Sequence, residues 1–175
     1  MMVYISHSRQ NSSAAFLLRD ALQKRGLEPW LDLVDVTPGT DWNQGVADAI
    51  RKADGFVFLL GPSGPEDRGQ NYEWQQILEN QYDADRVKAM IPVVVGEVEM
   101  PGFLKTRRIL SAPPADFEAV ADEVVKGLKS PAETIDQEKI EKGREERVRS
   151  MKRLRDYAQE LEKKEDARRR LSGLE

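Results

Sequence analysis

The sequence predicts an α/β fold of the flavodoxin-like kind. A five-stranded parallel sheet of order 2-1-3-4-5 is expected, flanked by helices and followed by a charged C-terminal helix. Short apolar segments rich in β-branched and aromatic residues alternate with longer segments whose apolar residues recur at helical spacing. The clearest strand is 55–60, a continuous apolar run that is typical of a strand buried on both faces. Strands that alternate with helices form a parallel sheet, because each helix makes a right-handed crossover between two strands.

Five strands and four helices are expected in the first 130 residues. The strands are predicted at 3–6, 27–31, 56–60 and 90–96, with a weak fifth strand at 107–110. The helices are predicted at 13–25, at 42–53, from 71 onward and at 116–129, because each of these segments carries an apolar stripe. Gly26 is expected to end the first helix. Asn71 is expected to cap the third, which would place Glu73 in its first turn.

Residues 131–175 form a second region, because charged residues there outnumber sparse apolar ones. Acid-to-base pairs four residues apart, such as Glu145–Arg149, favour a solvated helix. The apolar positions Met151, Leu154, Ala158 and Leu161 are too few to sustain a coiled coil. We therefore expect an exposed helix or connector, or alternatively a short self-association helix, that folding of residues 1–130 does not require. We leave open that the natural chain continues into a sensor or partner-binding module.

Composition excludes several kinds of chemistry. The absence of cysteine excludes disulfides, thiolate nucleophiles and cysteine-bound metals. The single histidine, His7, makes a histidine-rich metal site or a Ser-His-Asp triad hard to build, so no metal site is expected. Carboxylate chemistry is the main resource left to an enzyme of this composition.

Charge and hydropathy limit the partners that we expect. Residues 1–130 carry 14 Lys and Arg against 19 Asp and Glu, which argues against binding of nucleic acid by this region. The chain has neither a membrane-length apolar run nor a secretory signal pattern at its N-terminus. We therefore expect a cytoplasmic protein without a membrane partner.

Polar residues follow the first and third predicted strands, where a ligand site is expected. In a sheet of order 2-1-3-4-5 the switch point lies between strands 1 and 3, and ligands bind there at the carboxyl edge. Ser6–Arg9, the 61–70 loop and Glu73 converge on this point. The alternative for Glu73 is structural, because the helix dipole alone favours an acid in a first turn by up to about 1 kcal/mol.

Two common protein families with this fold do not match the sequence. A receiver domain needs a phosphorylatable aspartate after strand 3, where this chain has Leu60-Gly61-Pro62. A flavodoxin needs a glycine-containing phosphate loop after strand 1, which is also missing.

Five short motifs in the correct order resemble a TIR (Toll/interleukin receptor) domain of the bacterial type over residues 1–130. They are Tyr4-Ile5-Ser6-His7-Ser8; Gly26 with Trp30-Leu31-Asp32; Asp32, Gly39 and Trp42; Gly61-Pro62-Ser63-Gly64 with Gln70 and Glu73; and Ile91-Pro92-Val93. The resemblance implies an enzyme that cleaves NAD at the nicotinamide–ribose bond, as an effector in defence or toxicity. NAD is then the substrate, no cofactor is needed, and the product is linear or cyclic ADP-ribose.

By the same resemblance, Glu73 is the catalytic residue. The implied NAD-binding residues are His7, Ser8, Arg9, Asp32, Trp42 and Gln70. The structural alternatives are a strand-end histidine that packs under the loop for His7 and a turn-initiating aspartate for Asp32.

The resemblance also implies self-association through a loop at Leu33–Asp41, called the BB loop in this family. One departure is Gly69, where relatives often have an aromatic residue; Tyr72 or Trp74 are candidates to replace it. The departure keeps open a non-enzymatic TIR scaffold that acts by assembly alone. Nucleoside deoxyribosyl transfer, which also uses a carboxylate on such a sheet, fits the order of the motifs less well.

Overall fold

The computed structural model of the chain describes residues 1–62, 68–81, 87–113, 116–129, 145–146, 148–160 and 163–164. Its centre is a five-stranded sheet in the order β2-β1-β3-β4-β5, and every pairing is parallel. The strands are β1 (Met2–His7), β2 (Glu28–Trp30), β3 (Gly55–Leu60), β4 (Ala89–Val95) and β5 (Leu110–Ala112). The predicted fold class and strand order are confirmed.

The fifth strand lies further along the chain than the sequence predicted. The predicted range of 107–110 overlaps β5 only at Leu110. Arg107 instead closes a turn, in which its backbone N–H donates to the carbonyl of Leu104 at 2.9 Å. The strand begins where apolar residues alternate, because Ala112 is buried and Leu110 packs against the core of the α1 and α5 face.

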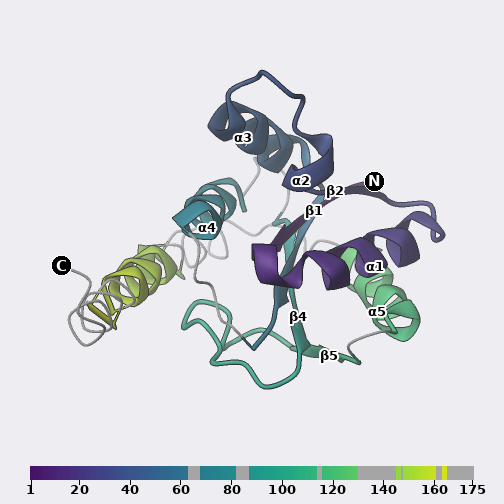
Figure 1. Cartoon of the computed structure of the whole chain (residues 1–175). Helices are drawn as coiled ribbons and strands as arrows, with labels where there is room; N and C mark the ends of the chain where they lie inside the picture. The colour runs from purple at the N-terminus through teal and green to yellow at the C-terminus, as the bar shows by residue number, and fades with distance from the viewer. Residues whose placement is uncertain are drawn as a thin grey trace, which may run out of the picture.

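Helices cover both faces of the sheet (Figure 1). α1 (Ser12–Gln23) and α5 (Glu118–Lys129) pack on one face, where Leu18, Leu22 and Val124 belong to the same core cluster as Val57 of β3. α3 (Trp42–Lys52) and α4 (Arg68–Asn80) pack on the other face, where a second cluster contains Ile50. Two short elements follow strands: η1 (Arg9–Asn11) after β1 and α2 (Asp32–Asp35) after β2. Because both layers are formed, every residue of β3 is buried.

Helix α4 begins earlier than the sequence predicted, and this changes the position of Glu73. The helix starts at Arg68, so Asn71 lies inside it rather than at its N-cap, and Glu73 lies in the second turn. Burial explains the extra turn, since Gln70 is only 3% exposed and its packing outweighs the weak helix propensity of Gly69 and Asn71. The helix dipole acts mainly on the first turn, so it no longer accounts for a carboxylate at this position.

The C-terminal helix contacts the domain. Residues 148–160 are helical, and the expected pair Glu145–Arg149 has its charged atoms 3.8 Å apart. Most side chains of this helix are exposed, but Leu154 is 1% exposed within the α3 and α4 core cluster. A Cβ built on Gly102 would lie 3.6 Å from the Cβ of Arg153, so the helix runs against this part of the chain. The expectation of an exposed helix or connector therefore needs correction at Leu154, while Leu161 lies outside the described residues.

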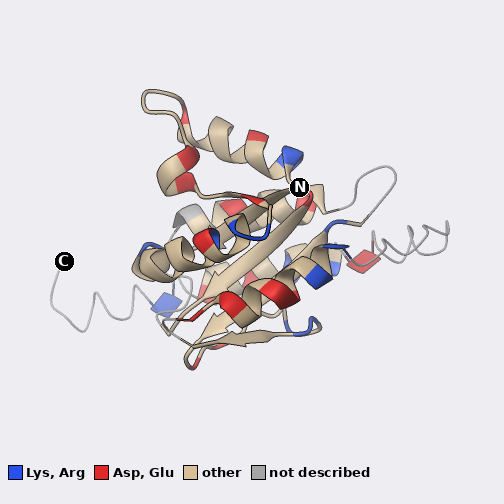
Figure 2. Cartoon of the chain, turned by 90° about the vertical axis from the view of Figure 1, so that its right-hand side faces the viewer, with Lys and Arg blue, Asp and Glu red and all other residues tan. Residues whose placement is uncertain are grey.

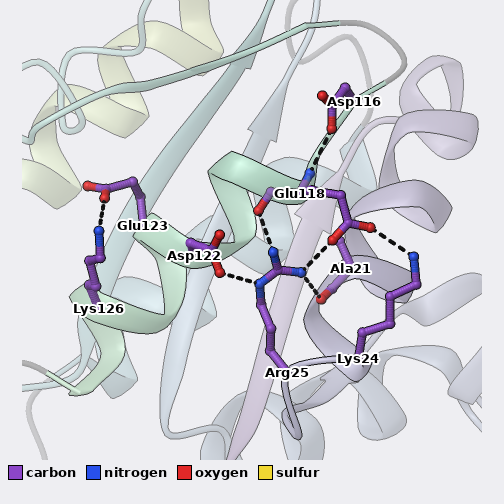
Figure 3. A network of polar contacts seen from close by, with 8 residues as sticks. All are labelled: Ala21, Lys24, Arg25, Asp116, Glu118, Asp122, Glu123 and Lys126. Atoms are coloured by element: carbon purple, nitrogen blue, oxygen red, sulfur yellow. Dashed lines mark hydrogen bonds and ion pairs between the residues drawn. The ribbon is translucent and has the colours of Figure 1, made fainter.

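Ion pairs join the turn that follows α1 to helix α5 (Figure 3). Arg25 Nε lies 2.6 Å from Asp122 Oδ1, and Arg25 Nη1 lies 2.8 Å from Glu118 Oε2. The ammonium of Lys24 lies 2.8 Å from the other oxygen of Glu118. Hydrogen bonds from Lys24 and Arg25 lower the pKa of Glu118, and a hydrogen bond from Arg25 lowers the pKa of Asp122. These groups are solvent-exposed, so water screens the attraction.

Charged residues of both signs are interspersed over the side of the molecule in Figure 2. No helix in the described part of the chain combines the length and the apolar composition that crossing a bilayer would need.

Candidate functional site

A cavity of about 180 Å³ opens at the carboxyl edge of the sheet. Residues from β1, η1, α2, α3 and α4 line it: His7, Arg9, Asp32, Leu33, Trp42, Gln70 and Glu73. Six of these seven are residues that the sequence analysis proposed for the site. Leu33 was expected only in the self-association loop, and Ser8 does not line the cavity. Residues 63–67, which the proposed loop motif includes, lie outside the described residues.

The ends of β1 and β3 approach one another closely at this edge. A Cβ at Gly61, just after β3, would overlap the side chain of Asn11 in η1. A larger residue at this position would have to displace the Asn11 side chain, so glycine favours the close approach of the segment after β1 to the end of β3. The cavity therefore lies at the switch point of the sheet, where ligands bind in folds of this class.

Glu73 is buried and hydrogen-bonded. Its side chain projects from the second turn of α4, and the residue is 3% exposed. Ser6 of β1 donates a hydrogen bond from Oγ to Glu73 Oε2 at 2.6 Å. Trp74 donates in turn from Nε1 to Ser6 Oγ at 3.1 Å. A carboxylate buried to this extent is costly to keep ionised without such partners.

Tyr4 lies in the buried region beneath the carboxylate. Burial, and next the charge of Glu73, raise the pKa of the Tyr4 hydroxyl well above its ordinary value of 10.0. Its ring stacks on Trp30 with the ring centroids 5.0 Å apart. The hydroxyl therefore keeps its proton at physiological pH and adds no second negative charge to the site.

His7 is a neutral imidazole that faces the cavity. Its Nδ1 lies 3.8 Å from Asp32 Oδ1, too far for a hydrogen bond. Burial lowers the pKa of His7 from 6.5, and the opposing effect of Asp32 is smaller. Neither ring nitrogen of His7 nor Gln70 Oε1 has a hydrogen-bond partner among the described residues. Buried polar atoms are normally paired, so three unpaired atoms in or beside one cavity point to a ligand that supplies the partners.

The remaining predicted residues have different surroundings. Ser8 is buried, and its Oγ accepts a hydrogen bond from Asn11 Nδ2 at 2.9 Å, within the turn that starts η1. Arg9 is exposed at the rim of the cavity. Trp42 begins α3 and lies with its ring centroid 6.0 Å from that of Tyr72.

Of the two aromatic residues considered as replacements at Gly69, only Tyr72 is placed for that role. Tyr72 is half-buried beside Trp42 of the cavity wall. Trp74 is fully buried, with its ring centroid 5.1 Å from that of Phe103 and 6.1 Å from that of Phe58. It therefore cannot stack on a ligand in the cavity.

The size of the cavity and its charged residues limit what it can hold. Small-molecule pockets usually measure about 300–1,000 Å³, so a cavity of about 180 Å³ encloses only part of a ligand of ordinary size. Among the described residues, no group of three His, Asp or Glu side chains could hold a metal ion.

The TIR domain family model matches residues 3–125, and the chain therefore belongs to the TIR domain family. No curated protein sequence matches the chain. The TIR domain of the Toll-related receptor TRR-2 from Hydra magnipapillata is 18% identical, with a TM-score of 0.60, over 73% of this chain and 98% of that chain. A metazoan TIR-STING receptor from C. gigas, in complex with 2',3'-cGAMP, is 19% identical with a TM-score of 0.61, over 76% of this chain and 40% of that chain. The TIR domains of the activated Roq1 resistosome are 14% identical with a TM-score of 0.51, over 91% of this chain and 98% of that chain.

These likenesses confirm the TIR fold that the motifs predicted. At identities of 14% to 19% they show the fold alone and assign no activity to this chain. The roles of the residues around the cavity stay predictions.

Proposed function

We propose that this TIR domain is an enzyme that cleaves NAD at the bond between nicotinamide and ribose. One observation carries the proposal: the buried carboxylate of Glu73 lines a cavity together with His7, whose ring nitrogens have no hydrogen-bond partner in the part of the chain that the structure describes. A carboxylate removed from water interacts strongly with a positive charge that develops beside it.

The chemistry suits a site in which one buried carboxylate, that of Glu73, acts on the reacting bond without help from a general acid. The nicotinamide of NAD is a pyridinium cation and departs as a neutral base when the C–N bond breaks, so its departure requires no proton. The ribose carbon becomes oxocarbenium-like in the transition state, as in glycoside hydrolysis. Glu73 stabilises this positive charge, and water or an internal nucleophile of the substrate then completes the transfer to linear or cyclic ADP-ribose.

The neighbouring residues fit the parts of the substrate. His7 is neutral and can donate one hydrogen bond and accept another, which suits the amide or hydroxyl groups of the nicotinamide riboside half. The carboxylate of Asp32 can accept a hydrogen bond from a ribose hydroxyl. Arg9 at the rim supplies a positive charge where the pyrophosphate would leave the cavity. Trp42 and Tyr72 offer aromatic surface beside it.

Chromatography of the reaction products tests the proposal. Concentrated wild-type protein incubated with NAD should release free nicotinamide in amounts that grow with time and exceed a protein-free blank. The ribosyl product identifies hydrolysis or cyclisation. Nicotinamide at the level of the blank over a wide range of protein concentrations would refute the proposal. Consumption of NAD would also account for the proposed role as a toxic effector, because cells depend on this dinucleotide.

A non-enzymatic scaffold is the second candidate, and the surface of the BB loop favours it. Leu33 and Val34 are 47% and 48% exposed, an apolar pair that a second TIR domain could cover. Self-association measured by analytical ultracentrifugation, together with a complete lack of nicotinamide release, would support this candidate over the enzyme.

For either candidate we propose residues 1–130 as the TIR domain and 131–175 as an extension that contributes to assembly or control.

A further inference from the structure

A chain of two hydrogen bonds leads from the core to the carboxylate of Glu73. Trp74 Nε1 donates to Ser6 Oγ at 3.1 Å, and Ser6 Oγ donates to Glu73 Oε2 at 2.6 Å. Ser6 and Trp74 are both 0% exposed. Water therefore does not compete for these hydrogen bonds, and their geometry is set by β1 and α4.

The direction of the chain is fixed by the chemistry of its members. An indole N–H can only donate, so it occupies a lone pair of the Ser6 hydroxyl. The one proton of that hydroxyl then points to the carboxylate. Trp74 itself is held in place by edge contacts with the rings of Phe58 and Phe103. The rigid aromatic cluster thus determines how the serine hydroxyl meets Glu73.

We propose that Ser6 and Trp74 are positioning residues, which hold the carboxylate of Glu73 in a fixed orientation toward the cavity. The inference rests on the proposed cleavage of NAD for its catalytic meaning. A displacement of about 1 Å of a reacting group can lower a rate about 100-fold. A short hydrogen bond to one carboxylate oxygen prevents such a displacement.

The same hydrogen bond favours the ionised form of Glu73, because a donor to a carboxylate stabilises its charge. Among the described residues, the titratable groups around this carboxylate include Tyr4 and His7 on β1, Arg9 on η1 and Asp32 at the start of α2. They are unchanged when Ser6 or Trp74 is replaced. A change in the titration of Glu73 would therefore report on the hydrogen bond.

Steady-state kinetics of three variants form the first test. In Ser6→Ala, kcat should fall about 10- to 100-fold while KM changes less than about threefold, because the loss concerns the transition state. Trp74→Phe should show a smaller fall in kcat, because this variant keeps the Ser6 hydroxyl and removes only the indole N–H that donates to it. Ser6→Thr, which restores a hydroxyl, should recover part of the rate. A Ser6→Ala variant with a wild-type kcat would overturn the proposal.

A matched variant separates positioning from loss of stability. Val120→Ala shortens a buried side chain of α5 on the opposite face of the sheet, and Val120 belongs to the other core cluster. It should lower the melting temperature and leave kcat unchanged. If Val120→Ala and Ser6→Ala lower kcat equally at equal loss of stability, Ser6 has no positioning role.

A carbon-13 NMR titration of the Glu73 carboxyl tests the hydrogen bond without any turnover. The midpoint should move to higher pH in Ser6→Ala and in Trp74→Phe relative to the wild type, with the larger shift in Ser6→Ala. An unchanged midpoint in both variants would overturn the inference. If the wild type releases no nicotinamide, the proposed function fails, but the titration still decides whether Ser6 controls this carboxylate.

Discussion

Shortening Leu154 to alanine should destabilise the protein measurably, although the residue lies in a highly charged helix. Leu154 is 1% exposed in the cluster that also contains Trp74 and Phe103. Removing a buried leucine side chain typically costs about 2–5 kcal/mol. We expect about 2–3 kcal/mol, because only one side of the helix 148–160 contacts the domain. For a chain of this size that corresponds to a fall in Tm of about 4–12 °C.

Thermal melting followed by circular dichroism measures this effect, and Val148→Ala is its control. Val148 lies in the same helix and is 66% exposed, so its truncation should change the free energy of unfolding by less than about 0.5 kcal/mol. Limited trypsin digestion should cleave the C-terminal region, which offers many Lys and Arg sites, faster in Leu154→Ala than in the control. Melting temperatures of the two variants within 1 °C of each other, with equal rates of cleavage, would refute the docking of this helix.

Three further predictions concern assembly, ion pairs and pH. Turnover of NAD per molecule should rise with protein concentration. Replacement of Gly39, whose φ of 86° suits glycine, by a bulky residue should lower this turnover. A specific activity that stays constant over a hundredfold dilution would contradict the prediction. Arg25→Ala should lower Tm at neutral pH, and this loss of Tm should shrink below about pH 4. The pKa values of Glu118 and Asp122 are lowered in the folded state, so their stabilising contribution disappears as they become protonated. An equal loss of Tm at every pH would argue against these ion pairs. Because the pKa of buried His7 is lowered, this imidazole binds a proton more readily in the unfolded state than in the folded state, so the stability of the protein should fall as pH drops below 6.5. In thermal melts between pH 5 and 8, His7→Gln should remove that part of the pH dependence.

The order of the sheet could be predicted because its strands are short and nearly all apolar. Burial on both faces leaves β3 without a polar residue, and the helices between the strands impose parallel pairing. The start of α4 could not be predicted in the same way. Gly69 and Asn71 are weak helix formers, and only the burial of Gln70 against its neighbours extends the helix over them.

The burial of Leu154 in the C-terminal helix could not be predicted for a related reason. Leu154 stands among charged residues, and its few apolar neighbours give no local signal of burial, since the residues that bury it lie far away in the sequence. A Cβ on Gly102 would lie 3.6 Å from the Cβ of Arg153, so a segment far away in the sequence supplies part of the surface that this helix covers.

The candidate site was largely visible in the sequence, because the topology brings the ends of β1 and β3 to one edge. His7, Asp32 and Glu73 lie around one cavity as expected. The position of Ser6 was missed as a partner of Glu73, although one signal was present. Ser6 follows Val3, Tyr4 and Ile5 in a buried strand, and a polar side chain in such a position needs a hydrogen-bond partner.

The central claim, that Glu73 is the catalytic residue, is tested most directly by measuring the release of nicotinamide from NAD by two variants. They are Glu73→Gln and its matched control Glu79→Gln. Glu79 lies on the same helix and is exposed, so both variants lose one negative charge from α4, but only one loses the carboxylate that lines the cavity. We expect Glu79→Gln to match the wild type and Glu73→Gln to lose activity about 100- to 1,000-fold with an unchanged fold, because the amide keeps the shape without the charge. A Glu73→Gln protein that retains more than about a tenth of wild-type activity would contradict the assignment of Glu73 as the catalytic residue.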